Sequence, residues 1–105
     1  MQRRALDFAS GFDVVAGNDD SQAALMVLGP GETVGSPSNR HMASDQWLYV
    51  VAGTGEAVVE GERVALGPGT LLLIERGEGH EICNTGAQPL ETLNVYVPPE
   101  YPLHG

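Results

Sequence analysis

Short apolar segments separated by glycine and proline run through most of this sequence, and this pattern restricts the fold more than any other feature. Turn residues recur at positions 29–31, 53–55, 67–69 and 77–79, and the 105 residues include 14 glycines and 7 prolines. Such punctuation favours many short strands over long helices, and no segment carries a sustained helical period. Successive apolar segments start roughly 8–12 residues apart, which predicts an all-β sandwich or barrel.

The chain length fits one domain over residues 1–105, with a barrel core over about 23–97. Residues 35–39, Gly-Ser-Pro-Ser-Asn, are expected to form a loop. The segments that we expect to be strands are 12–16 (as an edge strand), 23–28, 46–52, 56–60, 62–66, 70–74, 80–84 and 90–97.

Composition argues against several partners. The formal charge is −9, with 14 acidic against 5 basic residues, and such a surface repels nucleic acid and anionic membranes. No run approaches the roughly 18 apolar residues of a membrane span, and the first residues lack the apolar region of a signal peptide. Cys83 is the single cysteine, so an internal disulfide is impossible and no oxidising compartment is implied. We therefore expect a cytoplasmic protein.

Two histidines, His41 and His80, lie at the edges of predicted strands beside glycine-rich turns and are the candidates for chemistry. Side chains alternate between the two faces of a strand. His80 should therefore share a face with Ile82 and Asn84, while Cys83 lies on the other face. The third histidine, His104, follows Pro98-Pro99 in a predicted tail and is given no role.

The same alternation applies near His41. Asn39 and His41 share a face if the chain is extended there, and Gln46 shares a face with Leu48 and Val50. The intervening loop breaks the link between the two sets. Polar groups on otherwise apolar faces indicate inward-facing residues at the mouth of a barrel, where small ligands bind. In the last strand, the parity of Asn94 and Tyr96 stays open.

Residues 69–84 carry a specific spacing. Gly69 is followed by five residues, Glu75, one residue, Gly77, two residues, His80, three residues and Asn84. This resembles the second motif of the cupin family, in which proline stands at the position of Glu75. Every other residue and every spacing of that motif agrees.

The first cupin motif fits less closely. It reads glycine, five residues, His-x-His, three or four residues, glutamate, six residues and glycine. Anchored on Gly53, it places Gln46 in the glutamate position, His41 in the second histidine position and Asn39 in the first. A second register counts from Gly35 and makes His41 the first histidine. We prefer the register anchored on Gly53, because it is fixed inside a strand, where an insertion would reverse the faces.

The resemblance covers roughly residues 25–97 and implies a double-stranded β-helix, the jelly-roll barrel of small single-domain cupins. In the family, three histidines and a glutamate commonly hold iron, manganese, nickel, zinc or copper. The ligands implied here for a divalent transition metal are His41, His80, Gln46 and Asn39. Two neutral imidazoles can hold such an ion, but an amide oxygen is a weaker donor than the carboxylate it replaces.

Two functions follow from the resemblance. The first is a metal-binding cupin, an enzyme that acts on a small organic molecule by oxygenation, isomerisation or lyase chemistry. Glu75 and Glu78, near the mouth, are its nearest candidates for proton transfer. The alternative is a non-catalytic cupin that binds a small molecule and has a vestigial or empty metal site. The family's iron oxygenase sites use two histidines and a carboxylate, so Gln46 argues against oxygenase chemistry.

One predicted strand face also needs covering. Trp47, Tyr49 and Val51 alternate with Leu48 and Val50, and they should form an apolar surface on the outside of the barrel. A domain of this size buries a limited core, so pairing with a second copy adds burial. We therefore predict a homodimer.

Overall fold

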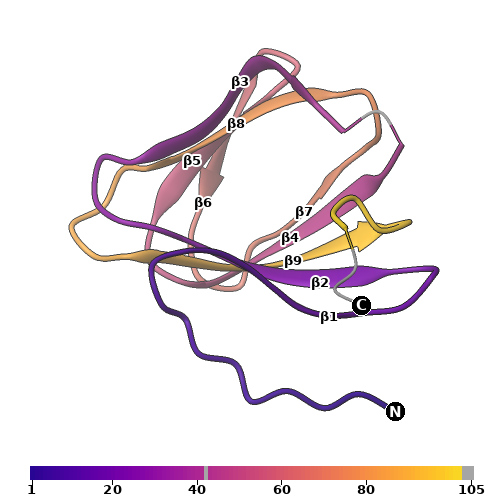
Figure 1. Ribbon diagram of the computed structural model, residues 1–105. Helices are drawn as coiled ribbons and strands as arrows, with labels where there is room; N and C mark the ends of the chain where they lie inside the picture. The colour runs from indigo at the N-terminus through magenta and orange to yellow at the C-terminus, as the bar shows by residue number, and fades with distance from the viewer. Residues whose placement is uncertain (42, 103–105) are drawn as a thin grey trace.

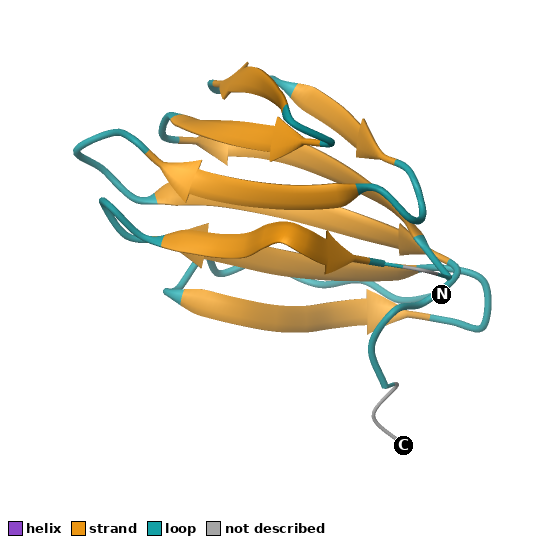
Figure 2. Ribbon diagram, turned by 90° about the horizontal axis from the view of Figure 1, so that it is seen from above, coloured by secondary structure: helices purple, strands orange, loops and turns teal. Residues whose placement is uncertain are grey.

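Two antiparallel sheets face each other in the computed structural model, which describes residues 1–41 and 43–102 (Figure 1). The larger sheet has the strand order β1-β2-β9-β4-β7, and the smaller has the order β3-β8-β5-β6. The strands are β1 (Gly11–Gly17), β2 (Gln22–Leu28), β3 (Thr33–Arg40), β4 (Asp45–Ala52), β5 (Gly55–Val59), β6 (Glu62–Leu66), β7 (Leu71–Ile74), β8 (Gly79–Asn84) and β9 (Leu90–Val97). Loops gather at the two ends of this sandwich (Figure 2).

The all-β prediction is confirmed, since residues 1–41 and 43–102 contain no helix. Within them, no helix is long and apolar enough to cross a membrane. The predicted strands all form, and the segment at 12–16 is an edge strand as expected. His104 lies outside the described residues.

The loop expected at residues 35–39 is a strand instead. These residues belong to β3, an edge strand whose pairing with β8 passes from Ser36↔His80 directly to Arg40↔Gly79. Positions 37–39 are therefore extra residues on β3. A bulge on an edge strand accepts proline and glycine, because no ladder hydrogen bond is required there. The composition of residues 35–39 thus predicts a loop where the structure has an irregular but extended strand.

The hydrophobic core lies between the inner faces of the sheets. On β4, Leu48 and Val50 are completely buried, while Trp47 and Tyr49 point outward and are about two-fifths exposed. This is the period-2 pattern predicted from the sequence. The core cluster also includes Ile82 of β8. Its other members are Met26, Leu28, Ala57, Leu66, Ile74 and Leu90.

The structure around Gly53 explains why the first motif ends in glycine. Its φ of 88° lies in the left-handed region, which only glycine adopts without strain. A Cβ atom at this position would also collide with the carbonyl of Pro89 and come within 2.8 Å of the Cα of Leu90. The turn after β4 can therefore pack against the start of β9 only with glycine here.

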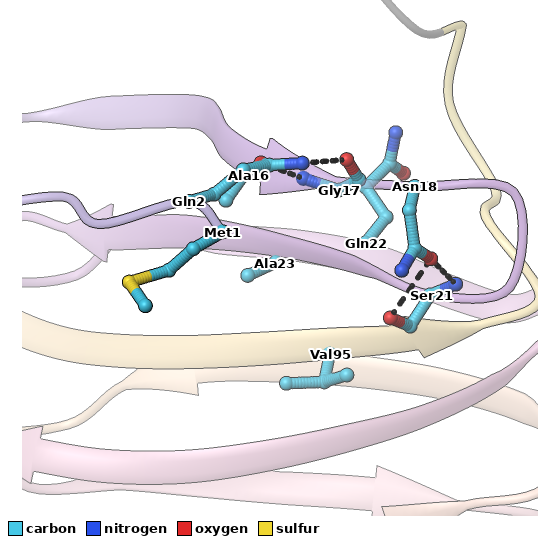
Figure 3. A pocket seen from close by; sticks show the side chains of 9 residues that line it. All are labelled: Met1, Gln2, Ala16, Gly17, Asn18, Ser21, Gln22, Ala23 and Val95. Carbon is cyan, nitrogen blue, oxygen red and sulfur yellow. Dashed lines mark hydrogen bonds between the residues drawn. The ribbon is translucent and has the colours of Figure 1, made fainter.

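An N-terminal arm, residues 1–10, runs beneath β1 and β2 on the outside of the larger sheet (Figure 1). Gln2 fastens it: its Nε2 donates to the Gly17 carbonyl at 2.6 Å, and the Gly17 N–H donates to its Oε1 at 3.1 Å (Figure 3). Met1 and Val95 border a hollow of about 460 Å³ there. Among the described residues that line it there is no His, Cys, Asp or Glu side chain.

Candidate functional site

A cavity of about 230 Å³ lies between the two sheets. The candidate ligands His41, His80, Gln46 and Asn39 all line this cavity, so the structure brings the four sequence-predicted residues together. Cys83 lies outside its lining, on the other face of β8, as predicted. The remaining lining residues are Phe12, Met26, Val34, Gly35, Ile82, Tyr96 and Tyr101.

His80 is held in one orientation at the start of β8. It is only 4% exposed, and its Nδ1 lies 3.2 Å from the carbonyl oxygen of Glu78. A carbonyl can only accept, so Nδ1 carries the hydrogen and the neutral ring keeps a lone pair on Nε2. Burial, the largest cause, lowers the pKa of His80, and nearby His41 adds to this; the bond to Glu78 opposes it. The neutral imidazole can therefore offer the lone pair on Nε2 to a metal ion.

Asn39 faces this lone pair. Its Nδ2 lies 3.4 Å from Nε2 of His80, a long contact in which the amide donates. An amide nitrogen does not bind metals, so Asn39 in this orientation contacts His80 rather than offering a ligand. Gly35 makes room for the contact: its φ is 83°, and a Cβ there would lie 3.0 Å from Asn39 Nδ2 and collide with the His80 carbonyl.

His41 follows β3 and leans over the same space. Its ring centroid is 4.9 Å from that of His80 and 5.3 Å from that of Tyr96. Its Nδ1 lies 3.0 Å from Oε1 of Glu100. Because a carboxylate only accepts, Nδ1 carries the hydrogen of this contact, and in the neutral ring Nε2 keeps its lone pair. Each histidine therefore has a protein acceptor on Nδ1, the arrangement that orients metal-binding imidazoles.

A chain of buried hydrogen bonds fixes the orientation of Gln46. Thr92 Oγ1 donates to the carbonyl of Met26 at 2.8 Å, so it must accept from its other neighbour, Asn94 Nδ2, at 3.0 Å. That leaves Asn94 Oδ1 to accept from Gln46 Nε2 at 2.9 Å. The Met26 carbonyl thereby fixes the orientation of the Asn94 and Gln46 side-chain amides.

The result is an unpaired, buried oxygen on a residue that lines the cavity. Gln46 is 3% exposed, and its Oε1 has no hydrogen-bond partner within residues 1–41 and 43–102. An unsatisfied buried acceptor costs about 1–3 kcal/mol. It can be satisfied by a cation or by a donor on a bound molecule.

The segment after β9 completes the site, and sequence reasoning missed it. Gln22, 1% exposed, holds the backbone of Tyr101 by two hydrogen bonds of 2.9 and 3.0 Å. Tyr101 packs on Phe12 and Tyr96, with ring centroids 4.7 and 5.2 Å away. This brings Glu100 to His41. The sequence predicts a tail after Pro98-Pro99, and nothing in the composition there indicates that the chain folds back.

The two tyrosines of the cavity keep their hydroxyl hydrogens. Burial is the main cause that raises the pKa of Tyr96, and its contact with Tyr101 and the nearby Glu100 raise it further. Burial also raises the pKa of Tyr101. Both side chains therefore remain neutral donors at neutral pH. Tyr96 is 2% exposed and Asn94 is completely buried, which resolves the parity of β9 that the sequence left open.

The donor chemistry of the cavity fits a divalent first-row ion in part. Two imidazoles with occupied Nδ1 atoms and one unpaired amide oxygen are neutral donors that such ions accept. In the described part of the chain, however, no three His, Cys, Asp or Glu side chains are grouped as metal ligands. A metal here would depend on Gln46. Glu75 and Glu78 are not among the described lining residues; Glu78 Oε1 accepts from the Glu75 N–H at 2.7 Å.

Comparison with known families agrees with this architecture. The family model for the cupin domain matches residues 24–96. The chain belongs to the cupin family. The match covers both motifs, from within β2 to the last but one residue of β9, and leaves the N-terminal arm, β1 and the residues from Val97 onward outside it.

Related cupins are known by sequence and by structure. A polyketide synthase protein, TcmJ of Streptomyces glaucescens, is 39% identical over 63% of this chain and 43% of its own. The oxalate-binding protein of Thermotoga maritima is 34% identical over 70% of this chain and 60% of its own. A solved structure from Bacillus halodurans superposes with a TM-score of 0.84 at 26% identity, covering 91% of this chain and 76% of that one. The chain thus spans about half the length of these curated relatives.

Proposed function

We propose that this cupin binds one divalent transition metal through His41, His80 and Gln46 and presents it to a small organic molecule in the cavity. Asn39 lies beside the set as the amide that contacts His80. The metal identity stays among iron, manganese, nickel, zinc and copper, and the reaction type stays open among oxygenase, isomerase and lyase chemistry.

The unpaired Oε1 of Gln46 carries this proposal. The hydrogen-bond chain through Asn94 and Thr92 prevents the amide from turning its NH₂ toward the cavity. A fixed acceptor beside two oriented imidazoles is what a cation requires, and a vestigial pocket has no reason to keep it. The cost of that acceptor is recovered when a ligand binds.

The residues around such a site would have different roles. A bound divalent ion would act as a Lewis acid that polarises an oxygen of the ligand. Glu78 and Glu100 keep the two imidazoles oriented through their Nδ1 atoms. The hydroxyl of Tyr96 is a neutral donor within the cavity lining. The names of the relatives, an oxalate-binding protein and a polyketide synthase protein, support a small organic ligand.

An empty polar pocket is the alternative. It is favoured by the contact of Asn39 with Nε2 of His80, which occupies the lone pair that a metal would need. In that case Gln46 Oε1 would accept a hydrogen bond from a ligand, and the protein would be a binding module without catalysis. Fold alone does not decide between the two.

Titration calorimetry with Ni²⁺, Zn²⁺ and Mn²⁺, together with elemental analysis of the purified protein, tests the proposal. We expect one ion per chain, and we expect His80→Ala to lower the affinity at least about tenfold because one imidazole remains. The matched control is Cys83→Ser, on the other face of β8, which should bind as the wild type does. Equal binding by wild type and His80→Ala, or none by either, would establish the empty pocket.

A second copy of the chain is the partner that we propose for the outside of the larger sheet. Trp47 lies opposite Leu73, and Tyr49 lies opposite Leu71, in the register of β4 and β7. These four side chains and Val51, named the β4–β7 patch, are between 37% and 60% exposed. None of the five side chains is charged, and the same patch on a second copy can meet it about a two-fold axis.

We also propose a cytoplasmic location. Cys83 is a free thiol, which suits a reducing compartment. Fractionation of cells that express the tagged protein checks this, and recovery in a membrane or secreted fraction would contradict it.

A further inference from the structure

A second hollow adjoins the cavity. This groove of about 580 Å³ is lined mainly by residues of β1, β2 and β3. Phe12, Met26, Val34 and Tyr101 line both the cavity and the groove. The two hollows therefore adjoin at these four side chains.

The groove differs from the cavity in its chemistry. Its walls carry the side chains of Phe12, Met26, Leu28 and Val34. The charged side chain among its described lining residues is Glu32, whose carboxylate already accepts a hydrogen bond from the Gly29 N–H. His41, His80 and Gln46 line the cavity and do not line the groove among the described residues. The combined space thus has one polar end and one apolar end.

The apolar end is open to solvent. Phe12 is 44% exposed and Val34 is 39% exposed, on strands at the edges of their two sheets. Tyr101, which is fixed by Gln22, packs against Phe12 with tilted rings, and both side chains line the two hollows. Covering this surface with a ligand would remove apolar area from water, which stabilises the complex by about 25 cal/mol per Å².

We infer that the ligand of this site is amphipathic: an anionic or neutral oxygen-bearing head group lies at His41, His80 and Gln46, and an apolar body lies in the groove against Phe12 and Val34. This inference rests on the proposed function for the head group and adds the class of molecule. An ion held by neutral donors keeps its full charge, which favours an anionic oxygen head. Glu32 and the net charge of −9 disfavour a second anionic end.

Two series of probes test the head and the body separately. Acetohydroxamate, butanohydroxamate and hexanohydroxamate carry a chelating head and are titrated into Zn²⁺-loaded protein. Acetamide, butanamide and hexanamide carry a donor for Gln46 Oε1 and are titrated into metal-free protein, with binding followed by amide chemical shifts. Affinity should rise with length in both series, by up to about fourfold per methylene. The shifts should move at Phe12 and Val34 as the chain lengthens.

Val34→Asp and Leu6→Asp form a matched pair, since the two apolar side chains are 39% and 41% exposed. Val34→Asp should abolish the dependence on chain length, while Leu6→Asp, in the N-terminal arm away from the groove and from the β4–β7 patch, should keep it. Circular dichroism establishes that both variants are folded, and the shift mapping on wild type stands independently of them.

The outcomes separate the two ideas. Length-independent affinity in both series, or a length dependence that survives Val34→Asp, would overturn the amphipathic ligand. Hydroxamates that bind no better with Zn²⁺ than without it would remove the metal proposal. In that case an amide series that still tightens with length would keep the groove inference. No binding in either series would overturn both.

Discussion

Nδ1 of His41 lies 3.0 Å from Oε1 of Glu100, so a residue beyond the last strand orients a histidine that follows β3. The contact is partly shielded, since the His41 and Glu100 side chains are 13% and 24% exposed. It depends on Gln22, which fixes the neighbouring Tyr101 from a third element, β2. One imidazole of the candidate metal site is therefore positioned by the segment that follows the barrel.

Replacing Glu100 by Gln should weaken metal binding. Glutamine can still accept from His41 Nδ1, but it removes the negative charge that makes the imidazole a stronger ligand. Partners of this kind typically contribute 10–100-fold to affinity, and we expect about tenfold for this conservative change. Calorimetry with Ni²⁺ measures it.

Glu91→Gln is the control for the lost charge. Glu91 lies on β9 and does not line the cavity among the described residues, so this variant changes the net charge equally. If it weakens binding as much as Glu100→Gln does, the effect is long-range and the contact with His41 has no special role.

Replacing Gln46 by Glu should tighten metal binding and destabilise the metal-free protein. A carboxylate is a stronger ligand than an amide for these ions, but it cannot donate to Asn94 Oδ1 as Gln46 does. The Asn94 amide must then turn over, so that its oxygen faces Thr92 Oγ1. Thr92 then either donates to this oxygen and loses its bond to the Met26 carbonyl, or keeps that bond and no longer accepts a hydrogen bond from Asn94. We expect a loss of about 1–3 kcal/mol in the free energy of unfolding, measured by urea denaturation without metal.

Gln46→Met separates the two effects. It removes both the donor and the oxygen, so metal affinity should fall below that of the wild type while Gln46→Glu rises above it. A Gln46→Glu variant that is as stable as the wild type would show that the hydrogen-bond chain does not fix the amide.

Alternation of side chains predicted the inner faces well. His80, Ile82 and Asn84 are all buried on one face of β8, because the faces of a regular strand follow from counting residues. The pairing of His41 with His80 was also predictable, since the spacing of the two cupin motifs carries it. Counting fails where a strand is irregular, and residues 35–39, which the composition predicts as a loop, lie in the irregular strand β3.

Glu100 and Tyr101 could not have been predicted in the same way. The contact between Gln22 and Tyr101 joins residues 79 positions apart, and no periodicity relates them. The hydrogen-bond chain from Met26 to Gln46 likewise crosses three strands, β2, β9 and β4. Its direction follows from which atoms donate, and that requires the three-dimensional partners.

Lowering the pH should destabilise the folded protein, because His80 takes up a proton more readily in the unfolded chain. Burial lowers its pKa in the folded state, whereas the unfolded chain has the ordinary value of about 6.5. The unfolded state therefore binds the proton more readily, so the folded state loses stability as pH falls below about 6.5, until the lower folded pKa is reached. Urea midpoints at pH 7.5 and 5.5 should show this decrease in the metal-free protein.

His80→Asn provides the comparison, because its amide can donate to Glu78 as Nδ1 does but does not titrate. Titrating groups that do not interact with His80 contribute equally in both proteins. The decrease between pH 7.5 and 5.5 should be smaller in His80→Asn, and equal decreases would exclude His80 as its source.

Replacing Trp47 by Asp should convert the proposed dimer to a monomer. Trp47 is 41% exposed in the β4–β7 patch and lies between the register partners Leu73 and Val95. Large aromatic side chains that are buried in an interface contribute about 2 kcal/mol or more to association, and a carboxylate added to a surface of net charge −9 repels its symmetry mate. The dissociation constant should rise at least about thirtyfold, which sedimentation at tens of micromolar protein detects.

Phe12→Asp, which changes a side chain of similar exposure (44%) at the groove, should leave the dimer intact. A wild-type chain that sediments as a monomer, or a dimer lost equally in both variants, would show that the β4–β7 patch does not bind a second copy.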